Sequence, residues 1–213
     1  MDRGMIGDKL TYHSSFKQNN KEVITELREH LISDERLCIA IGGESGSGKT
    51  SLAYALLLDI QEELNLKGYM FHLDDYFILP PKDNHNKRLE DISNVGIAEV
   101  NLELLDKDLK KFSNSKERLK KPLVNYQENT INQEIIYPND FHFCIVEGTY
   151  TMLLKQPTYK IFIENSFKDT KANREKRARD IMDDFNELVL EIEHKIIEVQ
   201  SKYANKTIRN NYL

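Results

Sequence analysis

The feature that most constrains this chain is the run at residues 43–50, which reads Gly-Glu-Ser-Gly-Ser-Gly-Lys-Thr. It matches the pattern G-x-x-x-x-G-K-[ST] and follows an apolar run at residues 37–41 that predicts a buried strand. Such a loop lies between a strand and a helix, because its glycines let successive backbone N–H groups curl inward around phosphate oxygens. The helix that follows adds the positive end of its dipole. The chain is therefore expected to bind a nucleoside triphosphate.

The loop pattern assigns a role to particular residues. Lys49 is expected to reach the β- and γ-phosphates of the nucleotide, and the Thr50 hydroxyl to ligate Mg²⁺. The full set of expected nucleotide contacts in this region is Gly43, Glu44, Ser45, Gly46, Ser47, Gly48, Lys49, Thr50 and Ser51.

Composition narrows the class of protein further. The chain has 213 residues, enough for one α/β domain with an appendage, and a formal net charge of −5. That charge argues against a general nucleic-acid binder, and we see no apolar stretch near the roughly 20 residues of a membrane span. The N-terminus lacks the apolar core of a signal peptide, so a cytoplasmic location is expected. Cys38 and Cys144 lie in apolar runs and are interpreted as small buried hydrophobes, with a disulfide between them as a lesser alternative.

The remaining elements follow from hydrophobic spacing. Further strands are predicted at 69–73, 141–146 and 160–164, and helices are predicted from residue 20, after the loop, and after the candidate N-cap Asn101. A polar stretch at 80–93 is interpreted as a mobile loop, and residues 1–19 as a loosely held arm. Short apolar strands that alternate with amphipathic helices indicate a parallel sheet covered on both faces.

The predicted organisation is therefore an α/β fold with a P-loop NTPase-type parallel sheet, helices on both faces, a small hairpin insertion and an arginine-bearing lid. Residues 1–34 form an N-terminal arm and helix, and residues 35–213 form the P-loop domain. Within that domain we expect the hairpin at 122–138, the lid at 165–180 and a C-terminal helix at 181–205. The apolar stripe of this last helix fits either core packing or a partner surface such as a homo-oligomer contact.

Acidic residues at the predicted strand ends decide what the triphosphate is used for. Ligands of an open α/β sheet lie beyond the carboxyl ends of its strands, where Asp74, Asp75 and Glu147 follow the second and third strands of the set. An acid there can hold Mg²⁺, as we expect of Asp74 and Glu147, or take a proton from an acceptor hydroxyl. A solvated turn for the aspartates and a helix-start acid for Glu147 are the plainer alternatives.

A basic cluster after the last apolar strand includes Lys171, Arg174, Lys176, Arg177 and Arg179. Its arginines could close over the triphosphate and neutralise charge on the transferred group, although a solvated helix face is the alternative for each one.

Four segments together carry a family resemblance, namely residues 42–50, 73–77 (Leu-Asp-Asp-Tyr-Phe), 145–150 (Ile-Val-Glu-Gly-Thr-Tyr) and 177–180 (Arg-Ala-Arg-Asp). In this order and spacing they resemble the uridine kinase and phosphoribulokinase family over residues 37–180. The resemblance implies that Asp74 is the catalytic acid and that Glu147 has a magnesium-linked role. It also implies phosphate contacts from Arg174, Arg177 or Arg179, of which the last two would act in catalysis. The acceptor would contact Asp75, Tyr76, Phe77 and Tyr126.

The departures from this family concern the acceptor side. An acid that contacts the sugar in uridine kinases is replaced by an apolar residue within residues 93–98, Ser-Asn-Val-Gly-Ile-Ala. The pyrimidine-reading segment P-x-Y-D, with its later His and Arg, is here Pro122-Leu-Val-Asn-Tyr126 with Asn129 and Ile131. Uridine specificity therefore does not follow, because a pocket selects a base through the groups that pair with it.

The resulting hypothesis is an ATP- and Mg²⁺-dependent kinase for a hydroxyl on a small metabolite such as a nucleoside or sugar, without nucleic-acid or membrane partners. A nucleotide-hydrolysing switch is the first rival, but the D-x-x-G and N-K-x-D strings that such proteins use are not in the sequence. A nucleotide-binding scaffold is the second rival. His72, which precedes Asp74 by two residues, is interpreted as a strand-end histidine and not as a metal ligand.

Overall fold

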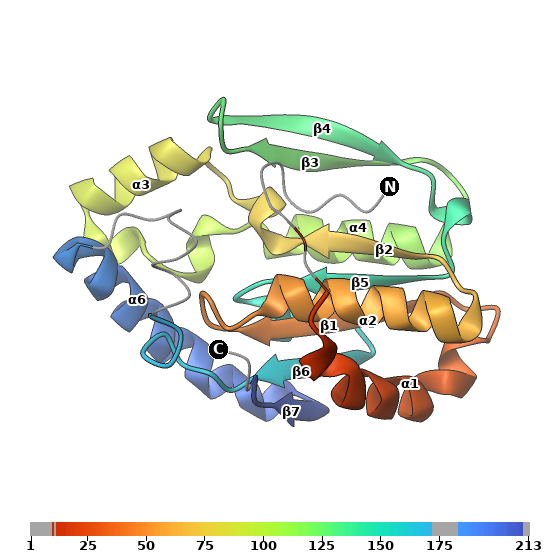
Figure 1. Ribbon diagram of the computed structural model, residues 1–213. Coiled ribbons are helices and arrows are strands. Elements are labelled where there is room, and N and C mark those ends of the chain that lie inside the picture. Colours follow the sequence, from red (N-terminus) through yellow and green to blue (C-terminus); the bar gives the residue numbers. More distant parts are fainter. Residues whose placement is uncertain (1–9, 11, 172–182, 211–213) are drawn as a thin grey trace.

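A five-stranded parallel sheet organises the chain, of which the computed structural model describes residue 10, residues 12–171 and residues 183–210. Its strand order is β2-β5-β1-β6-β7, and β3 and β4 form a separate antiparallel pair (Figure 1). The strands are β1 (Leu37–Gly43), β2 (Gly68–His72), β3 (Leu119–Asn125), β4 (Thr130–Ile136), β5 (Phe143–Glu147), β6 (Tyr159–Ile163) and β7 (Lys206–Ile208). The helices are α1 (Lys17–Leu31), α2 (Lys49–Leu64), α3 (Pro81–Glu90), α4 (Leu102–Asn114) and α6 (Asp184–Ile197).

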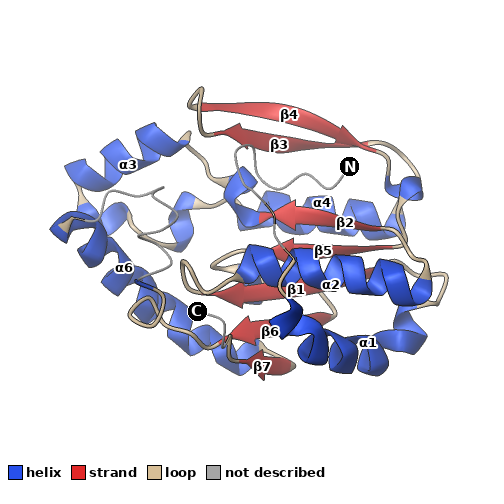
Figure 2. Cartoon of the chain, in the orientation of Figure 1, coloured by secondary structure: helices blue, strands red, loops and turns tan. Residues whose placement is uncertain are grey.

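Helices cover both faces of the sheet (Figure 2). Alternate residues of β1 point to opposite faces, as the two-residue period of a strand requires. Leu37, Ile39 and Ile41 pack with α1 and α2 in one core cluster. Cys38 and Ala40 pack with α4 and the end of α6 in the other. The predicted fold class is thus confirmed for the parallel sheet, its two helical layers and the hairpin.

The two cysteines lie opposite one another on neighbouring strands, with Cys38 of β1 in register with Cys144 of β5. Both are buried and both are free thiols. Burial raises the pKa of the Cys144 thiol well above its usual value. They behave as small apolar side chains of the sheet.

The N-terminal segment is less loose than the sequence suggests. Residues 1–9 and 11 lie outside the described residues, but Phe16 is buried and packs in the same cluster as β1. The Tyr12 hydroxyl donates a hydrogen bond to Asp59 of α2 at 2.9 Å. The prediction of a loose arm is therefore wrong for residues 12–19, and α1 belongs to the core of the sheet domain.

The prediction of a mobile loop at residues 80–93 is also wrong. Ten of these residues form α3, which begins with Pro81 at a position where a missing N–H is harmless. Few residues of this helix are buried, so it has only a weak apolar stripe. Hydrogen bonds of its polar side chains attach it to the rest of the protein instead. Asn84 and Arg88 both donate to the buried carboxylate of Glu99, at 2.7 and 2.5 Å.

The C-terminal helix is shorter than the predicted span of 181–205, of which residues 181–182 lie outside the described part. After α6 the chain continues as a 3-10 helix, Glu198–Tyr203, and then as the unpredicted edge strand β7. Val189 and Ile197 of the apolar stripe are buried, while Leu188 and Tyr203 remain 44% and 49% exposed. Core packing thus accounts for part of the stripe, and a homo-oligomer through this helix stays a prediction. Among the helices that the structure describes, none has the length and apolar character needed to cross a bilayer.

A buried ion pair fastens the hairpin to the end of β2. The Lys121 ammonium of β3 lies 2.6 Å from Asp75 Oδ2, and each side chain is 1% exposed. The second oxygen, Asp75 Oδ1, accepts a hydrogen bond from the Val124 amide at 3.0 Å. A buried charge needs such a partner, because an unpaired one is strongly destabilising.

We expect Asp75→Asn to lower the free energy of unfolding by about 3–5 kcal/mol, because it leaves the Lys121 charge buried without its closest carboxylate. Urea denaturation followed by circular dichroism measures this loss. The control is Glu63→Gln, which breaks an exposed ion pair with Arg28 at 2.6 Å and should cost less than about 1 kcal/mol. Equal losses in the two variants would show that the Asp75 pair does not fasten the hairpin.

Candidate active site

The loop between β1 and α2 has the conformation that an anion-binding loop requires. Gly48, the N-cap of α2, adopts a φ of 94°, a left-handed value that favours glycine. Gly43 has a φ of 146°, and a Cβ there would lie 2.9 Å from the Ile163 carbonyl oxygen. Both positions therefore need glycine, and the loop leads directly into the N-terminus of α2 at Lys49.

Side chains hold the carbonyl oxygens of this loop. The three donors are Lys49 Nζ to Glu44 O at 2.9 Å, Thr170 Oγ1 to Ser45 O at 3.0 Å and Asn210 Nδ2 to Ser47 O at 2.9 Å. Because these carbonyls are bonded within the protein, the loop is fixed in one shape before any ligand arrives. A rigid loop of this kind suits the binding of triphosphate oxygens by N–H groups.

Glu44, one of the predicted nucleotide contacts, uses its side chain for another purpose. Its Oε2 accepts a hydrogen bond from the Phe167 amide at 2.6 Å, and its Oε1 lies 2.7 Å from Nδ1 of His194 on α6. The carboxylate is buried behind the loop. Only the backbone of Glu44 is left as a candidate phosphate contact.

Glu147 ends β5 beside the loop and is buried. Its Oε1 lies 2.7 Å from Nδ1 of His72, the last residue of β2. Burial by itself would raise the pKa of Glu147, but the hydrogen bond and charge of His72 outweigh it and lower this pKa. Lys49 and a hydrogen bond with the Thr50 hydroxyl act in the same direction. For His72, burial would lower the pKa, yet the bond to Glu147 raises it. Both groups are therefore stabilised in their charged forms.

The donors around Thr50 and Glu147 fit a magnesium ion. Mg²⁺ prefers hard oxygen ligands and in kinases is bound by one or two protein groups together with water and substrate phosphates. The Thr50 hydroxyl in the first turn of α2 and the Glu147 carboxylate at the end of β5 match that description. The contact with His72 favours the charged form of this carboxylate. Among the described residues no three His, Cys, Asp or Glu side chains gather as a metal cluster.

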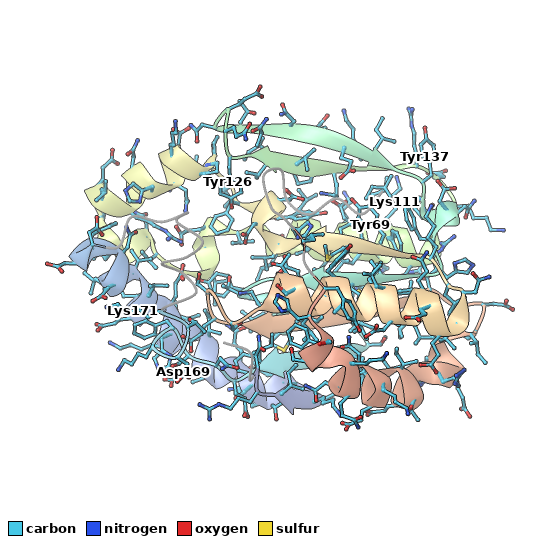
Figure 3. All side chains as sticks on the ribbon, in the orientation of Figure 1. Tyr69, Lys111, Tyr126, Tyr137, Asp169 and Lys171 are labelled. Atoms are coloured by element: carbon cyan, nitrogen blue, oxygen red, sulfur yellow. The ribbon has the colours of Figure 1, made fainter. Side chains whose placement is uncertain are left out.

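Asp74 follows β2 in the 3-10 turn Leu73–Tyr76, at the sheet edge where the loop lies. Its side chain is half-buried, and the Tyr126 hydroxyl is 3.5 Å from Asp74 Oδ2. Figure 3 shows Tyr126 at the end of the hairpin that lies nearest α3. The structure thus brings Asp74 and Tyr126 together.

The three residues after Asp74 lie differently. Asp75 is used in the buried pair with Lys121, and the buried Tyr76 hydroxyl donates to Asp108 of α4 at 3.0 Å. Phe77 forms an isolated bridge with Val100. These contacts hold the segment in place, so we leave Asp75 and Tyr76 out of the proposed acceptor contacts.

Of the predicted lid at 165–180, the structure describes only residues 165–171, so the lid stays a prediction. Arg174, Arg177 and Arg179 lie outside the described residues, so their roles remain predictions from the sequence. Lys171, at the edge of this segment, forms an ion pair with Glu187 of α6 at 2.8 Å.

A partly buried network of Arg88, Glu99 and Glu193 was not predicted from the sequence. The Arg88 guanidinium of α3 contacts Glu99 Oε2 at 2.9 Å and Glu193 Oε1 of α6 at 3.1 Å. Glu99 also accepts the Gly96 amide at 2.7 Å. Arg88 and Glu193 are 105 residues apart, and no local pattern relates them.

Loop, strand-end acids and sheet order together define the class of P-loop proteins to which small-molecule kinases belong. The model of the Phosphoribulokinase / Uridine kinase family matches residues 38–165, more than half of the chain. The chain therefore belongs to the phosphoribulokinase and uridine kinase family.

Several known proteins are similar to this chain. The bifunctional alpha-galactosidase/sucrose kinase AgaSK of Mediterraneibacter gnavus is 28% identical over 188 residues, which cover 81% of this chain and 20% of that protein. The chain thus spans about a fifth of the length of this relative. The structure of a possible uridine kinase from Bacillus stearothermophilus matches with a TM-score of 0.60 and 19% identity, over 90% of this chain and 98% of that one. Phosphoribulokinase from Rhodobacter spheroides matches with a TM-score of 0.63 and 12% identity, over 83% and 71% of the two chains. At these identities the two structures show the fold.

We expect Lys49→Met to weaken ATP binding by about 10- to 100-fold, the effect of losing a hydrogen bond from a charged donor. Isothermal titration calorimetry measures the dissociation constant. Lys21→Met, an exposed change on α1, is the control and should bind ATP as the parent protein does. Unchanged ATP affinity in Lys49→Met would remove this residue from the nucleotide site.

Proposed function

We propose that this protein transfers the γ-phosphoryl group of ATP, with Mg²⁺, to a hydroxyl of a small metabolite such as a sugar or nucleoside. One observation carries the proposal. In the sheet β5 lies between β1 and β2, and its Glu147 is in register with Ile41 on one side and His72 on the other. Since all three strands are parallel, the loop after β1 and Asp74 after β2 leave the same edge of the sheet.

On the donor side, the loop amides and Lys49 bind the triphosphate, and the N-terminus of α2 points at the same place. Thr50 and Glu147 would hold Mg²⁺, which neutralises negative charge on the phosphates when bound. We assign the lid arginines of residues 165–180, Arg174, Arg177 and Arg179, to the charge that develops on the transferred group.

On the acceptor side, Asp74 takes the proton of the acceptor hydroxyl. The oxygen of that hydroxyl then forms a bond to the γ-phosphorus, the bond from this phosphorus to the β–γ bridging oxygen breaks, and ADP leaves with the electron pair. The half-buried Asp74 carboxylate, 3.5 Å from the Tyr126 hydroxyl and at the same sheet edge as the loop, supports this assignment. Most of the rate gain would come from positioning and electrostatic stabilisation.

The relatives differ in what their names say they phosphorylate, and the base-reading residues of uridine kinases are missing here. A sucrose kinase relative at 28% identity favours a carbohydrate acceptor over a pyrimidine nucleoside. A cytoplasmic location remains part of this proposal, because both substrates are expected there.

Asp74→Asn should reduce phosphoryl transfer by roughly a hundredfold or more, because an amide cannot take the acceptor proton. ATP affinity should stay nearly the same. Mass spectrometry of ATP incubated with an acceptor panel measures product, and calorimetry measures ATP binding. Asp34→Asn, an exposed change before the amino end of β1, is the control. Full turnover in Asp74→Asn would exclude the proposed role, and release of free phosphate alone by the parent protein would favour a hydrolytic switch.

A further inference from the structure

Tyr150 has a buried hydroxyl that the fold does not use. The side chain is 1% exposed, and its oxygen has no hydrogen-bond partner within the described part of the chain. Tyr150 lies three residues after Glu147, directly before a 3-10 turn at Thr151–Leu153. Buried hydroxyls are ordinarily bonded, so one without a partner at a sheet edge that binds substrates indicates a group that a ligand completes.

The charged groups nearest in effect to Tyr150 include Asp74, the residue proposed to activate the acceptor hydroxyl. Its ring packs in the core cluster that contains Val100 and Ile197, and its hydroxyl is within electrostatic range of Glu193, Glu99 and Arg88. Burial raises the pKa of the Tyr150 hydroxyl, and the charges of Glu193 and Glu99 add to this effect, as does Asp74 more weakly. The hydroxyl therefore stays protonated and can donate a hydrogen bond.

A cavity adjoins this network between α3, the turn before α4, and α6. Its volume is about 220 Å³, and Asn84, Glu99 and Ile196 are among the residues that line it. That volume corresponds to about seven water molecules at roughly 30 Å³ each. Figure 1 shows α3 and the first turns of α6 beyond the carboxyl ends of the strands, and the Arg88–Glu193 pair joins them.

The charges of the described residues in this region disfavour an anionic ligand. A free guanidinium would bind a phosphate or carboxylate, but Arg88 already contacts two carboxylates, those of Glu99 and Glu193. Asp74 adds a third acidic group near Tyr150. Among the described residues that line the cavity, the positively charged group is Lys87, which is exposed. Carboxylate and amide oxygens instead accept hydrogen bonds from hydroxyl groups.

We propose that Tyr150 and the Arg88–Glu99–Glu193 network form the acceptor subsite, and that the acceptor is an uncharged polyhydroxylated compound. Sugar phosphates and sugar acids are excluded as acceptors. This inference rests on the proposed kinase function and adds to it the chemical class of the substrate.

The first experiment compares matched acceptors in the full-length protein with ATP and Mg²⁺. The pairs are D-fructose with fructose 6-phosphate, D-ribose with ribose 5-phosphate, and glycerol with glycerate, and sucrose and uridine are added as uncharged compounds. Phosphorylated products are measured by mass spectrometry. Transfer to uncharged compounds alone supports the subsite. Transfer to the charged member of a pair overturns it and leaves the kinase proposal standing, whereas no transfer to any compound overturns the kinase proposal and the subsite with it.

The second experiment uses Tyr150→Phe, which keeps the ring and removes only the hydroxyl. The KM of the best uncharged acceptor should rise about tenfold, the equivalent of one hydrogen bond, while the KM of ATP stays constant. Tyr159→Phe is the matched control, because that hydroxyl donates to Glu26 at 2.6 Å from the amino end of β6 and should leave both constants unchanged. An unchanged acceptor KM in Tyr150→Phe overturns the subsite.

A further variant tests the charged network independently of Tyr150. Glu193→Gln keeps the shape of the side chain and removes one negative charge that faces Arg88. The ratio of the inhibition constant of fructose 6-phosphate, which is not itself phosphorylated, to the KM of the best uncharged acceptor should fall several-fold, because Arg88 is then less fully matched and attracts an anion. A constant ratio counts against the subsite, and a melting temperature close to that of the parent protein shows that the variant is folded.

Discussion

The parallel pairing of β5 between β1 and β2 is the constraint on which the rest of the site depends. Because these strands run in the same direction and end in register, three chain segments emerge at one edge of the sheet. One is the phosphate loop, one begins at Asp74, and one begins at Gly148 after the buried Glu147. The register brings His72 against Glu147, so that a charged carboxylate is kept in the apolar interior. A slip of one residue would turn these side chains to the opposite face of the sheet.

The sequence was sufficient for those parts of the fold that depend on local pattern. The apolar runs became strands within one or two residues, Asn101 caps α4 by accepting the Leu104 amide at 3.0 Å, and the loop is as its glycines predict. Strand ends in a parallel sheet share an edge, so placing Asp74 and Glu147 near the loop needed only the order of the strands.

The parts that could not be predicted depend on contacts between distant residues. Asp75 reads as a site residue until the structure shows Lys121, 46 positions later, beside it. The polarity of α3 resembles that of a loop, and Glu99 and Glu193 become visible as its partners only in three dimensions. Tyr150 belongs to the segment 145–150 of the family resemblance, but the sequence gives it no role, because a hydroxyl without a partner is recognised only when its neighbours are known. These are cases in which tertiary contacts override local propensity.

Two consecutive residues of α6 contact two different parts of the candidate site. Glu193 pairs with Arg88 of α3 at 3.1 Å, and His194 pairs with Glu44 of the phosphate loop at 2.7 Å. Because both residues belong to one helix, a tilt of α6 would change the distances of both ion pairs together. The contacts of α3 and of the phosphate loop with the C-terminal part of the chain thus meet on one helix, at two consecutive residues.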